Sequence, residues 1–272
     1  MNTLVLGANG KTGRRVADRL TARGVPVRRG TRAGTPRFDW EEPGTWSPAL
    51  AGVDAVYVSY FPDLAVPGAV DAVRELTDLA EKAGVRRLVL LSGRGETEAQ
   101  AAEDVVRAGG IEWTVVRCAW FNQNFSEGHL LDPLLGGDVA LPAEEVREPF
   151  LDVEDIADVA VAALTEPGHG GRTYEMTGPR LLTFAEAVAE IAEATGRPLT
   201  YRPTDLGTYL AATGMPEDVT GLLGYLFSEL LDGRNAWVGD GVEQALGRPA
   251  KDFSEFVRDN VPVWQVTAQP AR

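Results

Sequence analysis

The chain has 272 residues, of which 44% are hydrophobic and 24% charged, and its net charge is −14. These values are typical of a globular protein with a substantial core, and no apolar run approaches the ~20 residues of a membrane helix. The acidity argues against a nucleic-acid partner. An apolar run follows Met1 at once, and Cys118 is the only cysteine, so we expect no signal peptide, no internal disulfide and a cytoplasmic location.

The N-terminus predicts a nucleotide-binding turn. An apolar run, Thr3–Leu6, leads directly into the stretch GANGKTG at residues 7–13, and an amphipathic stretch follows it. Strand, glycine turn and helix form the start of a dinucleotide-binding βαβ unit. Gly7 permits the tight turn, Gly10 lets the backbone approach the pyrophosphate, and Gly13 lets helix and strand pack closely. The N–H groups and the dipole of the helix start then hold the phosphates. A glycine turn that serves packing only is the alternative.

The end of the second predicted strand, residues 25–31, indicates which cofactor binds. NAD-preferring proteins carry an acidic residue about 20 residues past the glycines, but this region has no carboxylate and holds Arg28, Arg29 and Arg32. Guanidinium groups match a 2′-phosphate through charge-assisted bonds. We therefore expect NADP(H), with Arg32 as the first choice and Arg28 or Arg29 as the second. The alternative is an exposed basic turn.

The rest of the first half alternates strands and helices, which predicts an α/β fold: a Rossmann-type, doubly wound parallel sheet with helices on both faces. Ligands of such sheets bind at the carboxyl ends of the strands. The predicted strands are residues 37–39, 55–59, 87–91 and 112–117. The predicted helices are residues 45–50, 66–83 and 97–109, and a capping box at residues 97–100 opens the last of them.

Beyond residue 120 the alternation gives way to short strands, loops and helices. A second capping box, at residues 183–186, opens a helix. We predict that residues 1–150 form an NADP(H)-binding Rossmann domain to which residues 151–182 return. Residues 183–272 are predicted to form a smaller, interleaved C-terminal α/β lobe, with the substrate bound in the cleft between the two.

Several motifs together resemble the NmrA-like branch of the atypical short-chain dehydrogenases, close to its bacterial NAD(P)H-binding and quinone-oxidoreductase-like members. They are the GxxGxxG turn, Arg32, FDW at 38–40, LSG at 91–93, Glu103, WTVVR at 113–117 and FNQN at 121–124.

The resemblance implies a Rossmann domain that binds NADP(H), with roles that range from small-molecule reduction to non-catalytic redox sensing. It also implies positions for individual side chains. Asn9, Lys11 and Thr12 would lie at the pyrophosphate, and Ser59 and Ser92 would border the ribose and the nicotinamide.

The usual catalytic sets are missing. Short-chain dehydrogenases reduce carbonyls with a Tyr-x-x-x-Lys pair, but none of the six tyrosines has a lysine four residues later. With two histidines, His129 and His169, and one cysteine, no metal site is expected. The motif Gly-x-Ser-x-Gly does not surround Ser92.

Hydride transfer to a quinone-like or other conjugated acceptor remains as a candidate reaction, because it needs little help from the protein. Its product is a stabilised anion that solvent can protonate. Aromatic residues after the strands suit a flat substrate, although packing in the core is an alternative for each of them. The expected substrate-binding residues are Tyr60, Phe61, Trp120, Phe121, Asn124 and Phe150. The candidates for catalysis are Tyr60 and Asn122.

Three functions fit these observations. The first is an NADPH-dependent oxidoreductase acting on a conjugated small molecule, which the aromatic residues favour. The second is a non-catalytic NADP(H) sensor that binds a partner protein, which the missing Tyr–Lys pair favours. The third is a reductase in the biosynthesis of a specialised metabolite. The sequence leaves the assembly state open, a homo-oligomer included.

Overall fold

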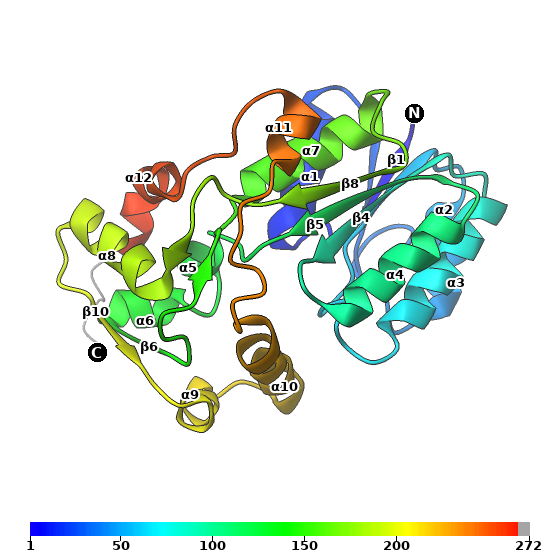
Figure 1. Cartoon of the computed structure of the whole chain (residues 1–272). Helices are drawn as coiled ribbons and strands as arrows, with labels where there is room; N and C mark the ends of the chain where they lie inside the picture. Colours follow the sequence, from blue (N-terminus) through cyan, green and yellow to red (C-terminus); the bar gives the residue numbers. More distant parts are fainter. Residues whose placement is uncertain (266–272) are drawn as a thin grey trace. The chain divides into compact units, whose positions relative to one another are not determined.

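The computed structural model describes residues 1–265, which form two compact units (Figure 1). The first unit consists of residues 1–118, 153–176 and 240–249. The second consists of residues 119–152, 177–239 and 250–265. The assignment of a cofactor domain and a substrate lobe to these parts stays a prediction.

The first unit is built on a six-stranded sheet in the order β2-β1-β3-β4-β5-β8, in which all neighbours are parallel. Every residue of β1 and β3 is buried, because helices cover both faces of the sheet. The strands are β1 (Thr3–Leu6), β2 (Val27–Gly30), β3 (Ala55–Val58), β4 (Arg87–Gly93), β5 (Glu112–Cys118) and β8 (Arg172–Met176).

Two layers of helices flank this sheet (Figure 1), which confirms the predicted Rossmann-type fold. One face carries α1 (Lys11–Ala22), α7 (Val153–Thr165) and α11 (Gly241–Leu246). The other carries α2 (Trp46–Leu50), which a short 3-10 turn (Pro43–Thr45) precedes, α3 (Ala69–Lys82) and α4 (Thr97–Ala108).

The strand order places a ligand-binding position at the end of β1. The chain leaves β1 for β2 on one side and returns to β3 on the other side. Such a reversal opens a crevice at the carboxyl ends of the strands, where ligands of open α/β sheets bind. The glycine turn follows β1 at this point.

Two local predictions for the first unit are wrong. Residues 37–39 form no strand, because Arg37 pairs with Asp39 and Glu42 in a loop, and β2 is left as the edge strand of the sheet. The capping box at residues 97–100 is absent, since Glu96 is the N-cap of α4 and its side chain makes no capping bond.

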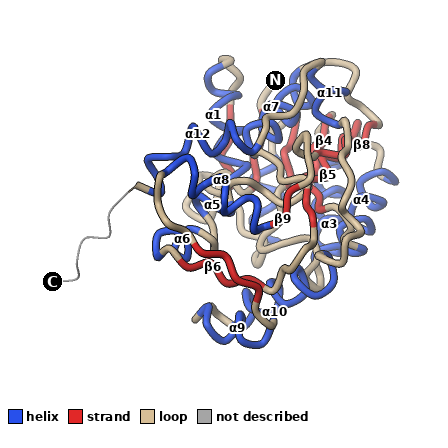
Figure 2. The backbone as a smooth tube through the Cα atoms, turned by 60° about the vertical axis from the view of Figure 1, so that its left-hand side comes forward, coloured by secondary structure: helices blue, strands red, loops and turns tan. Residues whose placement is uncertain are grey.

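The second unit combines two small sheets with several helices (Figure 2). The predicted capping box at Thr183 is confirmed, because Thr183 and Glu186 each accept the other's backbone N–H. Strands β6 (Asp138–Leu141) and β10 (Thr200–Pro203) pair in parallel, and β7 (Arg147–Glu148) and β9 (Leu182–Thr183) are antiparallel. The helices are α5 (Asn124–Glu127), α6 (Leu131–Gly136), α8 (Phe184–Thr195), α9 (Leu206–Thr213), α10 (Glu217–Tyr225), the π-helical turn Leu226–Leu230 and α12 (Phe253–Trp264).

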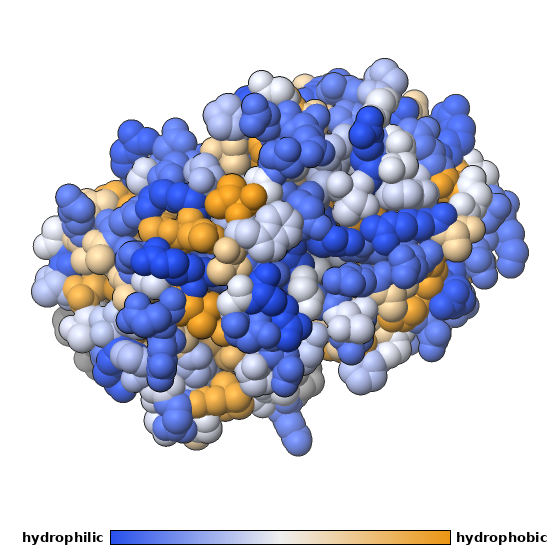
Figure 3. Space-filling view, viewed as in Figure 1, coloured by the Kyte–Doolittle hydropathy of each residue, from blue (hydrophilic) through white to orange (hydrophobic). Residues whose placement is uncertain are grey.

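Each unit has its own apolar core. On the face drawn in Figure 3, hydrophilic side chains predominate and apolar ones form small separate groups. Most large apolar side chains are buried in these cores, but Phe61 is 70% exposed.

Candidate cofactor site

The glycine turn has the geometry that the sequence predicts. Gly7 has a φ of +64°, which favours glycine, and its carbonyl accepts the N–H of Gly10 at 2.8 Å. A Cβ on Gly13 would lie 2.2 Å from the oxygen of Gly7, so α1 approaches β1 too closely for any side chain there. A Cβ on Gly7 would lie 3.2 Å from Ser59 Oγ. The turn after β1 therefore rests against the end of β3.

The start of α1 is open to an anion. Gly10 is its N-cap and makes no side-chain capping bond, and the first turn carries no acidic residue. The first N–H groups of a helix lack partners within it, and the positive end of the dipole favours a phosphate there. Asn9 and Gly10 are exposed, whereas Thr12 is buried. The backbone of this turn thus fits a diphosphate.

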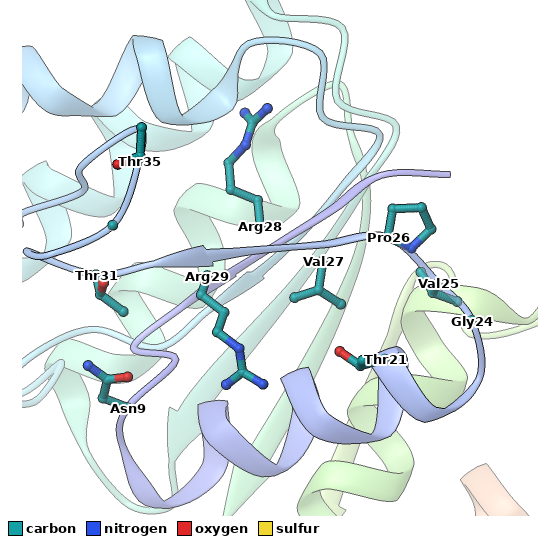
Figure 4. A pocket seen from close by; sticks show the side chains of 11 residues that line it. Asn9, Thr21, Gly24, Val25, Pro26, Val27, Arg28, Arg29, Thr31 and Thr35 are labelled. Atoms are coloured by element: carbon teal, nitrogen blue, oxygen red, sulfur yellow. The ribbon is translucent and has the colours of Figure 1, made fainter.

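A hollow of about 730 Å³ runs along β2 and reaches the glycine turn (Figure 4). Asn9 lines it from the turn, and Thr31 and Thr35 line it from the loop after β2. Arg28 and Arg29 point to opposite sides of the strand (Figure 4). The structure thus brings together the two segments that the sequence assigns to the cofactor.

The three candidate arginines differ in their partners. Arg28 donates to the carbonyls of Ala49 at 2.6 Å and Ala51 at 2.8 Å. Arg29 pairs with Asp18 at 2.6 Å. Arg32 is exposed, and no hydrogen bond or ion pair joins it to the described residues. Of the three, Arg32 is therefore the one whose guanidinium is available to a phosphate.

Arginines of α1 are paired with α7. Arg15 lies 2.5 Å from Glu154, and Arg19 contacts both Glu154 and Asp158. Burial alone would raise the pKa of Glu154, but the hydrogen bonds from Arg19 and Arg15 outweigh it and lower the pKa. The ion pairs of these arginines therefore link α1 to α7.

Of the two serines predicted to border the cofactor, Ser59 lies beside the glycine turn and Ser92 is buried. Ser92 donates to Glu103 at 2.6 Å, and Glu103 also accepts bonds from Arg107 and Arg117. The hydrogen bond with Glu103 raises the pKa of Arg117. Glu103 thus anchors α4 to β4 and β5, and the hydroxyl hydrogen of Ser92 is committed to it.

The aromatic residues after β3 have contrasting surroundings. Tyr60 is half-buried against Trp40, with ring centroids 4.7 Å apart, and burial raises its pKa. A tyrosine that donates its proton with the help of a lysine needs a lowered pKa, so Tyr60 is a poor proton donor. Phe61, in contrast, is open to a flat ligand.

The remaining candidates belong to the second unit. Trp120 packs against Phe184 and Phe227, and Phe150 is 2% exposed between Phe184 and other core rings. This environment favours a packing role for both. Phe121 and Asn124 are half-buried. Asn122 is fully buried, and neither polar atom of its amide has a hydrogen-bond partner among residues 1–265.

The sequence analysis missed a pair of neighbouring carboxyl groups, Asp63 and Glu96. Burial and the neighbouring Asp63 raise the pKa of Glu96 to about 9, and burial also raises the pKa of Asp63. The two residues lie on different loops, 33 positions apart. No spacing rule connects them, so only the fold reveals the pair.

Other kinds of site are not found in the described part of the chain. It holds no group of His, Cys, Asp and Glu residues suited to a metal ion. Cys118 is buried, and burial raises the pKa of its thiol, which keeps it protonated. None of the helices in residues 1–265 has the length and apolar character to cross a membrane.

Comparison with known proteins decides the family. The model of a family described as NAD(P)H-binding matches residues 7–167, which include the glycine turn and α7. The chain belongs to this NAD(P)H-binding family. This match confirms the resemblance to an NAD(P)H-binding family that the sequence predicted.

Two relatives and one solved structure are similar to this chain. An NAD(P)H azoreductase of Xenophilus azovorans is 34% identical, over 89% of this chain and 85% of its own length. Agroclavine dehydrogenase of Claviceps fusiformis is 29% identical, over 97% of this chain and 99% of its own. The structure of an NADPH-dependent quinone oxidoreductase from Escherichia coli complexed with NADPH is similar in fold, with a TM-score of 0.76, 21% identity, and coverage of 95% of this chain and 99% of that one.

Proposed function

We propose that this protein is an NADPH-dependent reductase that transfers a hydride to a quinone-like or other conjugated small molecule. The observation that carries the proposal is the glycine turn, where an uncapped helix start shares a hollow with the end of β2. The relatives named for azo compounds and quinones support the class of acceptor.

Several groups would hold the cofactor. Backbone N–H groups at Gly10 and the first turn of α1 would bind the diphosphate, and Arg32 would bind the 2′-phosphate. Asn9, at the edge of the hollow, would contact the adenosine half. Arg28 is not part of this set, because its donors are held by two carbonyls. When bound, the cofactor supplies the hydride.

The acceptor is proposed to be conjugated because this chain lacks the usual acid. A simple ketone needs a proton donor as the hydride arrives, whereas a quinone or azo compound spreads the incoming charge. Tyr60 is a poor donor, and no tyrosine is followed by a lysine at the fourth position. The exposed ring of Phe61, which follows β3, would pack against a flat acceptor.

The test is to follow oxidation of NADPH by its absorbance with a panel of quinones and azo dyes. Steady consumption is the expected result, and NADH should be the poorer donor. Tight binding of NADPH without turnover would favour the second function, a redox sensor.

A third function, a reductase of a specialised metabolite, is favoured by one specific observation. The chain matches agroclavine dehydrogenase over nearly the whole length of both proteins. Turnover with agroclavine, together with slow turnover of quinones, would favour this function.

A further inference from the structure

Asp63 and Glu96 lie in loops at the edge of the sheet where ligands bind. Asp63 follows the end of β3 by five residues, and Glu96 follows the end of β4 by three. These strands are neighbours and parallel, so their carboxyl ends lie at the same edge as the glycine turn after β1. That edge is where open α/β sheets bind their ligands.

The side chain of Glu96 has an unusual position. Glu96 is the N-cap of α4, yet its carboxyl does not cap the helix. It lies against Gly93 instead, where a Cβ would come within 2.2 Å of Oε1 and 2.4 Å of Oε2. Only 6% of Glu96 is exposed, and its Oε2 is buried without a hydrogen-bond partner in the described chain. Gly93 thus leaves room for a carboxyl that is directed away from its helix.

Glu96 is buried beside Asp63, and burial together with the neighbouring carboxyl raises its pKa, so the pair holds a proton at neutral pH. The groups around the pair favour keeping that proton. Glu98, in the first turn of α4, adds negative charge, and the nearby Cys118 thiol is neutral. The neighbouring cation, Arg94, is buried and lies 3.3 Å from Glu175.

We propose that the Asp63–Glu96 pair donates the proton that completes the reduction. This inference rests on the proposed function. When bound, the reduced nicotinamide would supply a hydride with its two electrons, and an acceptor that takes it would become an anion. The anion forms a new bond to hydrogen as the O–H bond of the pair breaks. Asp63, the more exposed member, delivers the proton, and the doubly ionised pair recovers a proton from water.

This arrangement would replace the missing Tyr–Lys pair. Two carboxyls that cannot both ionise keep one proton at neutral pH, and a positioned acid accelerates proton transfer by about 10²- to 10⁴-fold. Glu96 sets the affinity for the proton, since it is the more deeply buried member. Asp63 would be the residue that meets the acceptor.

The test compares two acceptors with Glu96→Gln and Asp63→Asn. A quinone takes a hydride and then needs a proton, whereas a cationic triarylmethane dye becomes neutral on taking a hydride and needs none. Glu96→Gln leaves one negative charge on the pair at neutral pH, as in the unchanged protein, but removes the proton that the pair holds. We expect kcat with the quinone to fall at least ~10-fold in both variants, with kcat for the dye and the Kd of NADPH unchanged.

Glu98→Gln is the matched control, because Glu98 adds negative charge near Glu96 and is not a member of the pair. It should leave the quinone rate within about twofold of the unchanged protein. Equal losses with quinone and dye in the Glu96 and Asp63 variants would overturn the proposal, since the pair would then only hold the two loops together. Unchanged rates with both acceptors would overturn it as well.

A second measurement needs no turnover. Infrared spectra of the protein alone at neutral pH should show the carbonyl band of a protonated carboxylic acid, and Glu96→Gln should remove it. Its absence from the unchanged protein would overturn the proposal whatever the rates are. A protein that binds NADPH but reduces neither acceptor would contradict the proposed function, and the donor role with it. Turnover of both acceptors without the band would contradict the donor role alone.

Discussion

The arginines near the end of β2 carry the same charge in different surroundings. Arg28 is held by two backbone carbonyls and Arg29 by Asp18, whereas Arg32 is exposed without a partner in the described chain. A free guanidinium can give its full set of donors to a phosphate. Arg28 and Arg29 would first have to break the hydrogen bonds and the ion pair that hold them.

Arg32→Ala should therefore weaken the binding of NADPH far more than the binding of NADH. The loss of charge-assisted bonds to a phosphate predicts a rise of roughly 10- to 100-fold in the Kd of NADPH and little change for NADH. Arg28→Ala is the control and should lower stability without changing the preference. Fluorescence titration of both cofactors measures the two constants, and equal losses for NADPH and NADH would refute the assignment of Arg32.

The raised pKa of Glu96 predicts that the stability of the protein depends on pH. This pKa is about 9 in the folded protein against an ordinary 4.5. Between these values the folded state holds a proton that the unfolded state has lost. The free energy of unfolding therefore falls as pH rises through this range, by up to about 1.4 kcal/mol per pH unit. Below pH 4.5 both states are protonated and the effect disappears.

Glu96→Gln should accordingly stabilise the protein at pH 8 by at least ~1 kcal/mol and leave it unchanged at pH 4. Urea unfolding at the two pH values measures this difference, with Glu98→Gln as the control. A variant less stable than the unchanged protein at pH 8 would contradict a raised pKa at Glu96.

The strand–turn–helix element that begins the chain places its glycines in unequal positions. A Cβ on Gly13 would overlap the backbone of Gly7 at 2.2 Å, whereas a Cβ on Gly10 would lie 3.2 Å from the same oxygen. Gly10 has an ordinary φ of −76°, so alanine fits its backbone conformation. We infer that glycine is needed for packing at position 13 and for the approach of a ligand at position 10.

Gly13→Ala should destabilise the fold by about 3 kcal/mol or more, because β1 and α1 must separate. Gly10→Ala should cost no more than about 1 kcal/mol and yet weaken NADPH at least ~10-fold, since its methyl group occupies the path of the pyrophosphate. Thermal unfolding and cofactor titration of both variants separate the two effects. The reverse order of stability would contradict this division of roles.

Across the whole molecule, local patterns predict elements better than they predict partners. The buried runs of β1, β3, β4 and β5 and the glycine turn could be read from the sequence, because periodicity and turn chemistry are local. The strand at residues 37–39 was predicted wrongly, since ion pairs hold Arg37 in a loop. The capping box at Thr97 failed because Glu96, turned toward Gly93, takes the N-cap position.

The site shows the same limit. The sequence gives no indication that Arg28 is bound by carbonyls or that Ser92 is committed to Glu103, and it leaves open whether Phe150 lies in a core. Each of these facts depends on contacts between distant residues. The pairing of Asp63 with Glu96 is of this kind too. The glycines could be placed correctly because their role follows from their own backbone.

Calorimetric titration of the protein with NADPH and NADH tests the central claim most directly. The claim is that the turn after β1 binds a diphosphate and that Arg32 adds the affinity for NADPH. It predicts saturable heat for one cofactor per chain, with NADPH bound at least ~10-fold tighter than NADH. The absence of heat with both cofactors would contradict it.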